Sequence, residues 1–306
     1  MGIDENGLGA SLGPLVVTAV VAEVSGRGGH SIDDWNSSAH DELLDDSKKL
    51  IRHGDVRLGE AWARVLTFES ASNPRQLLRL ISAVPVSRLM TRCPAHAQGQ
   101  CWNDTRDEFL ADDSLMARVK CVVQALRDLG IRPCHVLSRF VCTDELNARA
   151  QLLENRFLVD LHCMEELIVV AHERTEQPMG IVCGKVGGMH DYTRHFDRLR
   201  QSNPQIVNES KEVSLYRLSD ICEVKFLRDA DAMDPLVMLA SLVGKYLREL
   251  FVSRIGDHFS ELITNIKKPS GYHDPVTMEF VEATAKWRRK SAFPHSCFQR
   301  TGPRDT

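Results

Sequence analysis

Apolar residues along this chain occur in short β-branched runs and in longer segments with helical spacing. The run at 14–24, PLVVTAVVAEV, predicts a buried strand, and the stretch 2–4 before it predicts the end of another strand, joined to it by a glycine-rich turn. The segment 180–186, GIVCGKV, predicts a further buried strand, and 213–218 and 222–227 predict two more.

Helical patterns separate these strands. Apolar residues recur with a helical period at 56–66, 75–92, 113–129, 144–174 and 235–254. Pro235 opens the last of these segments, and proline is favoured in the first turn of a helix. Strands that alternate with helices predict an α/β protein with a mixed sheet. We expect one domain over 1–306, in which 56–175 is a largely helical insertion and 270–306 is a basic C-terminal segment with helix.

The composition is that of an ordinary globular protein, with 43% hydrophobic and 26% charged residues. No apolar run reaches the length of a membrane span, and the acidic start of the chain is unlike a secretory signal. The nine cysteines are odd in number and scattered, which favours reduced thiols over disulfides. We therefore expect a cytoplasmic protein with no membrane partner.

The charge balance gives no support to a surface dominated by nucleic-acid binding, because the net charge is -4. A local basic groove remains compatible with that balance. The basic run 287–290 is followed by Phe293 and Phe298, and such a mixture can follow a nucleic-acid backbone and stack on bases. The alternative is a C-terminal helix with a solvated basic face.

Acidic residues stand at predicted strand ends. Asp4 and Glu5 come directly before the turn that contains Gly7 and Gly9, and Asp231 lies between a strand and a helix. Hard ions such as Mg²⁺ bind a few carboxylates together with substrate phosphates. These acids are therefore candidate metal ligands that converge on one ion site, while the alternative is that they are merely solvated.

Four separated motifs carry a resemblance to type 2 ribonucleases H. They are GIDENGLG at 2–9, DSKKL at 46–50, the set Asp231, Ala232, Pro235, Ala240, Ser241 and Lys245, and the pair Gly271–Tyr272. Their order resembles that of the family over nearly the whole chain. The resemblance implies a ribonuclease H-like mixed sheet flanked by helices, with a helical insertion and a C-terminal helical region.

The same resemblance implies an activity, namely metal-dependent endonuclease cleavage of the RNA strand of an RNA/DNA hybrid. Asp4, Glu5 and Asp231 would be catalytic and would bind Mg²⁺ or Mn²⁺. The substrate-binding residues would be Gly7, Gly9, Lys48, Lys49, Ser241 and Tyr272, where the glycines and Tyr272 frame the ribose and the lysines steady the phosphate. The expected partner is the hybrid itself, bound by a monomer.

Two departures from the family pattern weaken this implication. Leu8 replaces an arginine of the glycine turn, and Gly184 stands where the family has a third carboxylate at the end of the central strand. The metal-binding set is therefore one member short, and Asp191 and Asp229 are nearby acids to consider as substitutes. The alternatives are a catalytically impaired relative that still binds nucleic acid, or a protein-interaction module that uses 56–175.

A second metal site is conceivable at Cys93, His96 and Cys101. Structural zinc sites usually show tighter paired spacing, so free thiols are the preferred interpretation.

Overall fold

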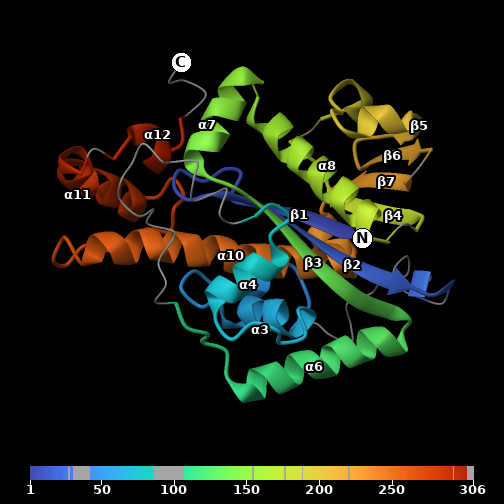
Figure 1. Ribbon diagram of the computed structural model, residues 1–306, viewed down its shortest axis with the longest axis horizontal. Helices are drawn as coiled ribbons and strands as arrows, with labels where there is room; N and C mark the ends of the chain where they lie inside the picture. Colours follow the sequence, from blue (N-terminus) through green and yellow to red (C-terminus); the bar gives the residue numbers. More distant parts are fainter. Residues whose placement is uncertain are drawn as a thin grey trace.

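A mixed sheet of seven strands forms the centre of the described protein (Figure 1). The computed structural model describes residues 1–26, 28–29, 42–85, 107–153, 155–175, 177–187, 189–219, 221–291 and 293–301. The strands are β1 (Gly2–Asn6), β2 (Leu15–Val24), β3 (Ile131–Val141), β4 (Met179–Gly184), β5 (Gln205–Glu209), β6 (Val213–Leu218) and β7 (Cys222–Leu227). They are ordered β3-β2-β1-β4-β7-β6-β5. β4 pairs in parallel with both β1 and β7, and the other pairs are antiparallel, so the predicted mixed α/β sheet is confirmed.

Helices lie between the strands and cover the sheet. They are α2 (Ser47–Leu50), α3 (Arg57–Leu66), α4 (Pro74–Ile81), α6 (Asp113–Asp128), α7 (Thr143–Leu152), α8 (Arg156–Thr175), α9 (Ala230–Met233), α10 (Pro235–Ser260), α11 (Pro275–Lys290) and α12 (His295–Phe298). The helix predicted at 144–174 is divided into α7 and α8. The strand β3 lies inside the segment that was expected to be a largely helical insertion, and it forms one edge of the sheet.

Strand β2 shows why the sheet has helices on both faces. Side chains of a strand point alternately to its two faces. Val16 and Val20 belong to one buried cluster with residues of α3, α6 and α10, whereas Val17 and Ala19 belong to another with residues of α8. Figure 1 shows the same division, with α8 on one side of the sheet and α10, α3 and α6 on the other.

The start of α10 is packed directly against β1. A Cβ atom built on Gly2 would lie 2.3 Å from the carbonyl carbon of Leu236, so only glycine permits this approach. Asp234 caps the helix, because its Oδ1 accepts the backbone N–H groups of Leu236 and Val237 at 2.8 and 3.0 Å. The short helix α9, which carries Asp231, is thereby fixed beside the end of β1.

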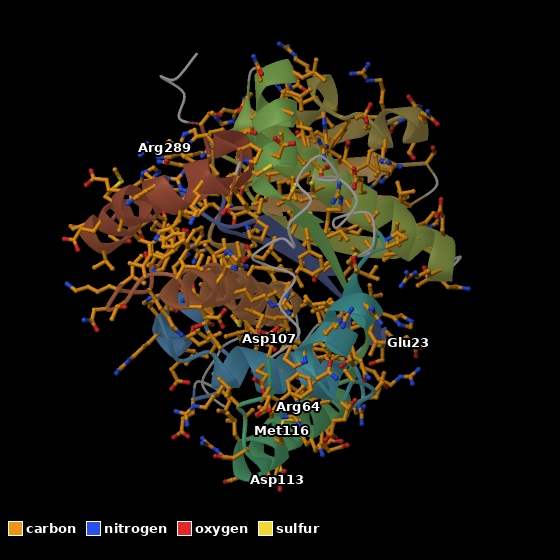
Figure 2. All side chains as sticks on the ribbon, turned by 60° about the vertical axis from the view of Figure 1, so that its left-hand side comes forward. Glu23, Arg64, Asp107, Asp113, Met116 and Arg289 are labelled. Atoms are coloured by element: carbon orange, nitrogen blue, oxygen red, sulfur yellow. The ribbon has the colours of Figure 1, made fainter. Side chains whose placement is uncertain are left out.

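Helices α3 and α6 lie below the sheet and contact each other (Figure 2, where Arg64 marks α3 and Met116 marks α6). Arg64 Nη1 donates to the carbonyl of Ala111 just before α6, at 3.2 Å. In the same layer, Arg254 of α10 is buried and its Nε donates to Asp107 Oδ2 at 2.6 Å.

The C-terminal segment is rich in basic residues, but they do not form a continuous basic surface. Arg289 projects outward from α11 (Figure 2), but Arg288 is buried, with its guanidinium carbon 4.1 Å from the centre of the Phe298 ring. Phe298 is itself buried, together with Phe280 and Phe259. These aromatic side chains form a small core of their own and do not present a stacking surface.

Two further expectations concern the whole chain. None of the helices in the described ranges is both long and apolar enough to cross a membrane. The thiols of Cys121, Cys134, Cys163 and Cys183 are not bonded in disulfides. Cys93, His96 and Cys101 lie outside the described residues.

Candidate functional site

A cavity of about 590 Å³ opens where β1 and β4 end and α9 begins. Because β1 and β4 are parallel, their carboxyl ends lie at the same edge of the sheet, which is where α/β proteins commonly place their sites. Asp4 and Glu5 of β1 line the cavity together with Asp231 of α9. Residues from the two ends of the chain therefore meet here.

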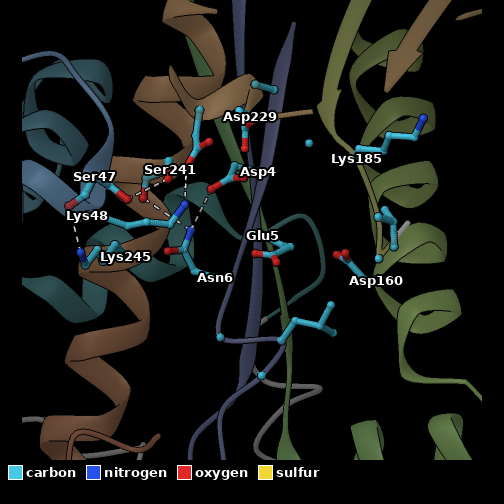
Figure 3. A pocket seen from close by; sticks show the side chains of 18 of the residues that line it. Asp4, Glu5, Asn6, Ser47, Lys48, Asp160, Lys185, Asp229, Ser241 and Lys245 are labelled. Atoms are coloured by element: carbon cyan, nitrogen blue, oxygen red, sulfur yellow. Dashed lines mark hydrogen bonds and ion pairs between the residues drawn. The ribbon is translucent and has the colours of Figure 1, made fainter. Parts of the chain in front are cut away.

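Asp4 occupies the side of the cavity next to α10. The amide of Asn6 lies 3.5 Å from Asp4 Oδ2, and it also donates to the carbonyl of Ser241 at 3.4 Å (Figure 3). Burial raises the pKa of Asp4 to about 7, although a hydrogen bond with Ser241 opposes the shift. Ser241 thus supports Asp4 from the helix.

Lys48 provides a cation at the rim of the same cavity. Its Nζ lies 2.9 Å from Asp231 Oδ2, and its side chain is 75% exposed. The hydrogen bond to Asp231 raises the pKa of Lys48. Lys49, which was expected to act beside it, is absent from the cavity lining, and its Nζ contacts both carboxylate oxygens of Asp45.

The α2 segment that carries Lys48 is attached to α10. Ser47 Oγ and Ser241 Oγ are 2.9 Å apart, and Lys245 Nζ donates to the carbonyl of Ser47 at 2.8 Å. Burial lowers the pKa of Lys245. Ser241 and Lys245 therefore position the neighbouring α2 segment.

Asp160 of α8 faces Glu5 across the cavity, and sequence analysis did not identify it as a site residue (Figure 3). Its side chain is fully buried, and neither carboxylate oxygen has a hydrogen-bond partner among the described residues. Burial, followed by repulsion from Asp4, raises the pKa of Asp160 to about 8. Burial and the neighbouring carboxylates of Asp160 and Asp4 also raise the pKa of Glu5 well above its usual range.

Gly184 ends β4 at the cavity, as predicted, and neither of the two acids considered as substitutes for it is buried beside it. Asp191 does not line the cavity, and its carboxylate contacts Arg194 at 2.6 Å. Asp229 does line it, but its side chain is 75% exposed and lies 3.6 Å from Arg228. Neither acid extends into the buried part of the site beside Gly184.

The glycine turn and the Gly271–Tyr272 pair lie on either side of one arginine. A Cβ atom built on Gly7 would lie 3.1 Å from Arg248 Nε, and one built on Gly271 would lie 2.7 Å from Arg248 Nη2. Both glycines have positive φ angles, of 89° for Gly7 and 81° for Gly271, which favour glycine. The guanidinium carbon of Arg248 is 4.1 Å from the centre of the Tyr272 ring. Gly7, Gly9 and Tyr272 all line the cavity.

Leu8 leaves the turn without an arginine of its own, but two arginines from other segments bind its backbone. The carbonyl of Leu8 accepts hydrogen bonds from Arg156 Nη1 and Arg300 Nη1, both at 3.2 Å. Arg300 is buried and also donates to the carbonyl of Gly13, and this burial lowers its pKa to about 9. Cations therefore stabilise the turn from outside it.

The site carboxylates surround the cavity and do not meet at a single point. No group of three or more His, Cys, Asp or Glu side chains within the described part of the chain is placed to hold a metal ion as it stands. Asp231 is bound to Lys48 in this arrangement, and the expected convergence of Asp4, Glu5 and Asp231 on one ion position stays a prediction. The acids remain close enough for their charges to influence one another.

Searches for similar proteins gave results for solved structures only. No protein-family profile and no curated protein matches the sequence. The ribonuclease HII in the PCNA complex from Archaeoglobus fulgidus is 18% identical, and the match covers 98% of this chain and 92% of that one, with a TM-score of 0.45. Ribonuclease H2 from Pyrococcus horikoshii is 16% identical over 97% and 90% of the two chains, with a TM-score of 0.41. Bst-RNase HIII in complex with Mn²⁺ is 11% identical over 98% and 65%, with a TM-score of 0.45.

Proposed function

We propose that the protein is a divalent-metal-dependent endonuclease that cleaves the RNA strand of RNA/DNA hybrids, as the resemblance to type 2 ribonucleases H implies. The observation that carries the proposal is that Asp4, Glu5 and Asp231 line one open cavity together with Lys48 and Tyr272. The ordered motifs had linked these residues by sequence, and the fold brings them together from distant segments.

The residues present fit Mg²⁺ or Mn²⁺. The available donors are carboxylate oxygens, which hard divalent ions prefer. Asp160 adds two buried oxygens that have no hydrogen-bond partner in the described chain. Mg²⁺ is commonly held by one or two carboxylates plus substrate phosphates, so a site without a closed protein cage is compatible with it.

Asp4, Glu5 and Asp231 would hold the ions, which when bound would stabilise the attacking and leaving oxygens of a phosphodiester. The other residues would bind and orient the substrate. Lys48 would bind a phosphate oxygen at the rim, where its ammonium group is already exposed. Tyr272, whose ring is 45% exposed beside the glycine turn, would contact the ribose.

A cleavage assay tests the proposal. A hybrid labelled at the 5′ end of its RNA strand is incubated with the protein and Mg²⁺ or Mn²⁺, beside DNA and RNA duplexes of the same sequence. We expect cleavage of the RNA strand in the hybrid alone. Asp231→Asn should lower the rate by a factor of about 10² to 10³, because removal of one electrostatic group at a catalytic site commonly has an effect of this size. Asp191→Asn is the matched control, since Asp191 lies outside the cavity.

Two other results would have distinct meanings. A protein that binds the hybrid without cleaving it, at any concentration of either ion, would be a catalytically impaired relative. A protein that binds no nucleic acid at low or moderate salt would contradict the proposal and would favour an interaction module.

A further inference from the structure

We propose that Asp160 of α8 is the metal-binding carboxylate that β4 lacks, so that this ligand has moved from the sheet to the helix facing it. The inference rests on the proposed function and adds a residue to that site. It follows from three features: the space at Gly184, the environment of Asp160, and the rigidity of α8.

The end of β4 has space where a side chain would otherwise enter the site. Among the described residues, a Cβ atom built on Gly184 would have one neighbour within 4 Å, namely Asp4 Oδ1 at 3.4 Å. A carboxylate at this position would therefore lie directly beside Asp4. Because Gly184 has no side chain, that part of the site depends on donors from other elements.

Asp160 of α8 lines the same cavity and faces Glu5 (Figure 3). It is fully buried, both of its oxygens lack a hydrogen-bond partner in the described structure, and its carboxylate points toward Glu5 (Figure 3). A buried carboxylate without a partner destabilises a fold, and such groups are normally paired or bound to metals. The charge of Asp160 acts on both Glu5 and Asp4, so it belongs to the same electrostatic cluster.

The helix that carries Asp160 is held firmly. Val159 and Leu161 on either side of it are fully buried in the core. Further along α8, His162 Nε2 lies 3.1 Å from the carbonyl of His195, and Glu165 accepts the backbone N–H of Asp197 at 3.0 Å. A ligand on an element anchored in this way is positioned as precisely as one at a strand end.

Mn²⁺ binding to the full-length protein, measured by isothermal titration calorimetry and by the Mn²⁺-induced shift in melting temperature, tests the inference without relying on activity. The variants are Asp160→Asn, Gly184→Asp, the two combined, and Asp231→Asn. Glu173→Gln is the control, because Glu173 is an exposed acid on the same helix. Asp160→Ser serves as a second variant if Asp160→Asn does not fold.

We expect Asp160→Asn to weaken Mn²⁺ binding at least tenfold, and Glu173→Gln to leave it unchanged. Gly184→Asp should restore binding to within about threefold of wild type when it is combined with Asp160→Asn, because both positions line the same cavity. In the wild-type background, Gly184→Asp should increase the Mn²⁺ affinity much less. This non-additivity is the signature of two residues that fill one role.

The possible failures are distinguishable. If Asp160→Asn binds Mn²⁺ as tightly as wild type while Asp231→Asn does not, the inference is wrong and the proposed function stands. Loss of binding in Asp160→Asn that Gly184→Asp does not restore would also overturn the relocation. If the wild type binds no Mn²⁺ with or without a hybrid, the proposed function fails and the inference fails with it.

Discussion

Replacement of Asp160 by asparagine should stabilise the protein in the absence of divalent ions. The substitution keeps the shape of the side chain and removes an ionisable group from a fully buried position where neither oxygen is hydrogen-bonded within the described chain. An unsatisfied buried polar group costs about 1 to 3 kcal/mol, and more if it is charged. Burial raises the pKa of Asp160 to about 8, so at pH 7.5 this side chain ionises more readily in the unfolded chain, which lowers the stability of the wild type. Asparagine cannot ionise but remains polar, so we expect a gain of about 1 to 3 kcal/mol.

The corresponding change in melting temperature follows from the size of the chain. An unfolding entropy of about 2.1 cal/mol/K per residue gives about 0.64 kcal/mol/K for 306 residues. A gain of about 1 to 3 kcal/mol therefore raises the melting temperature by about 2 to 5 °C. Differential scanning calorimetry in EDTA at pH 7.5 measures the shift, with Glu173→Gln as the control that should remain within about 1 °C of wild type.

When Mn²⁺ is added, the melting temperature of the wild type should rise above that of Asp160→Asn. A ligand that binds only the folded state raises the melting temperature, and the wild type should gain more than Asp160→Asn. A melting temperature that falls in EDTA would show that Asp160 stabilises the fold through a contact absent from this description. That result would refute the view that the residue is retained at a cost to stability.

Three further substitutions test the surrounding fold. Gly2→Ala should destabilise the protein by about 2 to 3 kcal/mol in urea unfolding, because its Cβ would lie 2.3 Å from the backbone of Leu236; an unchanged midpoint would contradict the close packing. Asp107→Asn should cost about 3 kcal/mol, since it leaves the buried guanidinium of Arg254 without its carboxylate; a loss below about 1 kcal/mol would show that other contacts suffice. Burial raises the pKa of Glu165 to about 7, so the folded state binds a proton at this carboxylate more tightly than the unfolded chain does. The contribution of this protonation to the free energy of unfolding is therefore lost as pH rises from about 4.5 to about 7. The difference in unfolding free energy between Glu165→Gln and wild type should therefore shift in favour of the variant across that window and stay constant above it, whereas a flat difference throughout would count against the raised pKa.

The hydrophobic pattern predicted most elements whose faces differ clearly in polarity. Strands β2, β6 and β7 are β-branched or alternating runs, and their positions were predicted to within about one residue. The long helix α10 was also predicted from Pro235, although it extends to Ser260. These segments owe their structure to local sequence and to burial of their apolar side chains, which in β2 lie on both faces of the strand.

Two strands could not be predicted because tertiary contacts define them. The sequence of β3, IRPCHVLSRFV, contains arginines and a proline that weaken its strand pattern, yet it pairs with β2 along its whole length. Two of the polar residues in β3 are satisfied by specific partners. Arg139 contacts Glu145 and Glu166, and Ser138 contacts Thr18. The edge strand β5 is short and mostly exposed, and its two apolar residues, Ile206 and Val207, are adjacent and form no alternating pattern.

The site was predicted in part. Motif order selected Asp4, Glu5, Asp231 and Tyr272, which all line the candidate site, but none of the four motifs contains Asp160. A signal for Asp160 was nevertheless present, because it stands at a buried position of a helical pattern with Met164, Leu167 and Ala171 at spacings of four, seven and eleven. An acid at a core position of an amphipathic helix is rarely tolerated without a partner or a function.

A crystal structure of the wild-type protein soaked in Mn²⁺, with anomalous difference data, tests the central claim most directly. We predict anomalous peaks inside the cavity, with a carboxylate oxygen of Asp160 and at least one oxygen of Asp4, Glu5 or Asp231 within coordinating distance. Peaks elsewhere, an empty cavity at saturating Mn²⁺, or a bound ion that Asp160 does not reach would contradict the assignment of this carboxylate to the metal site.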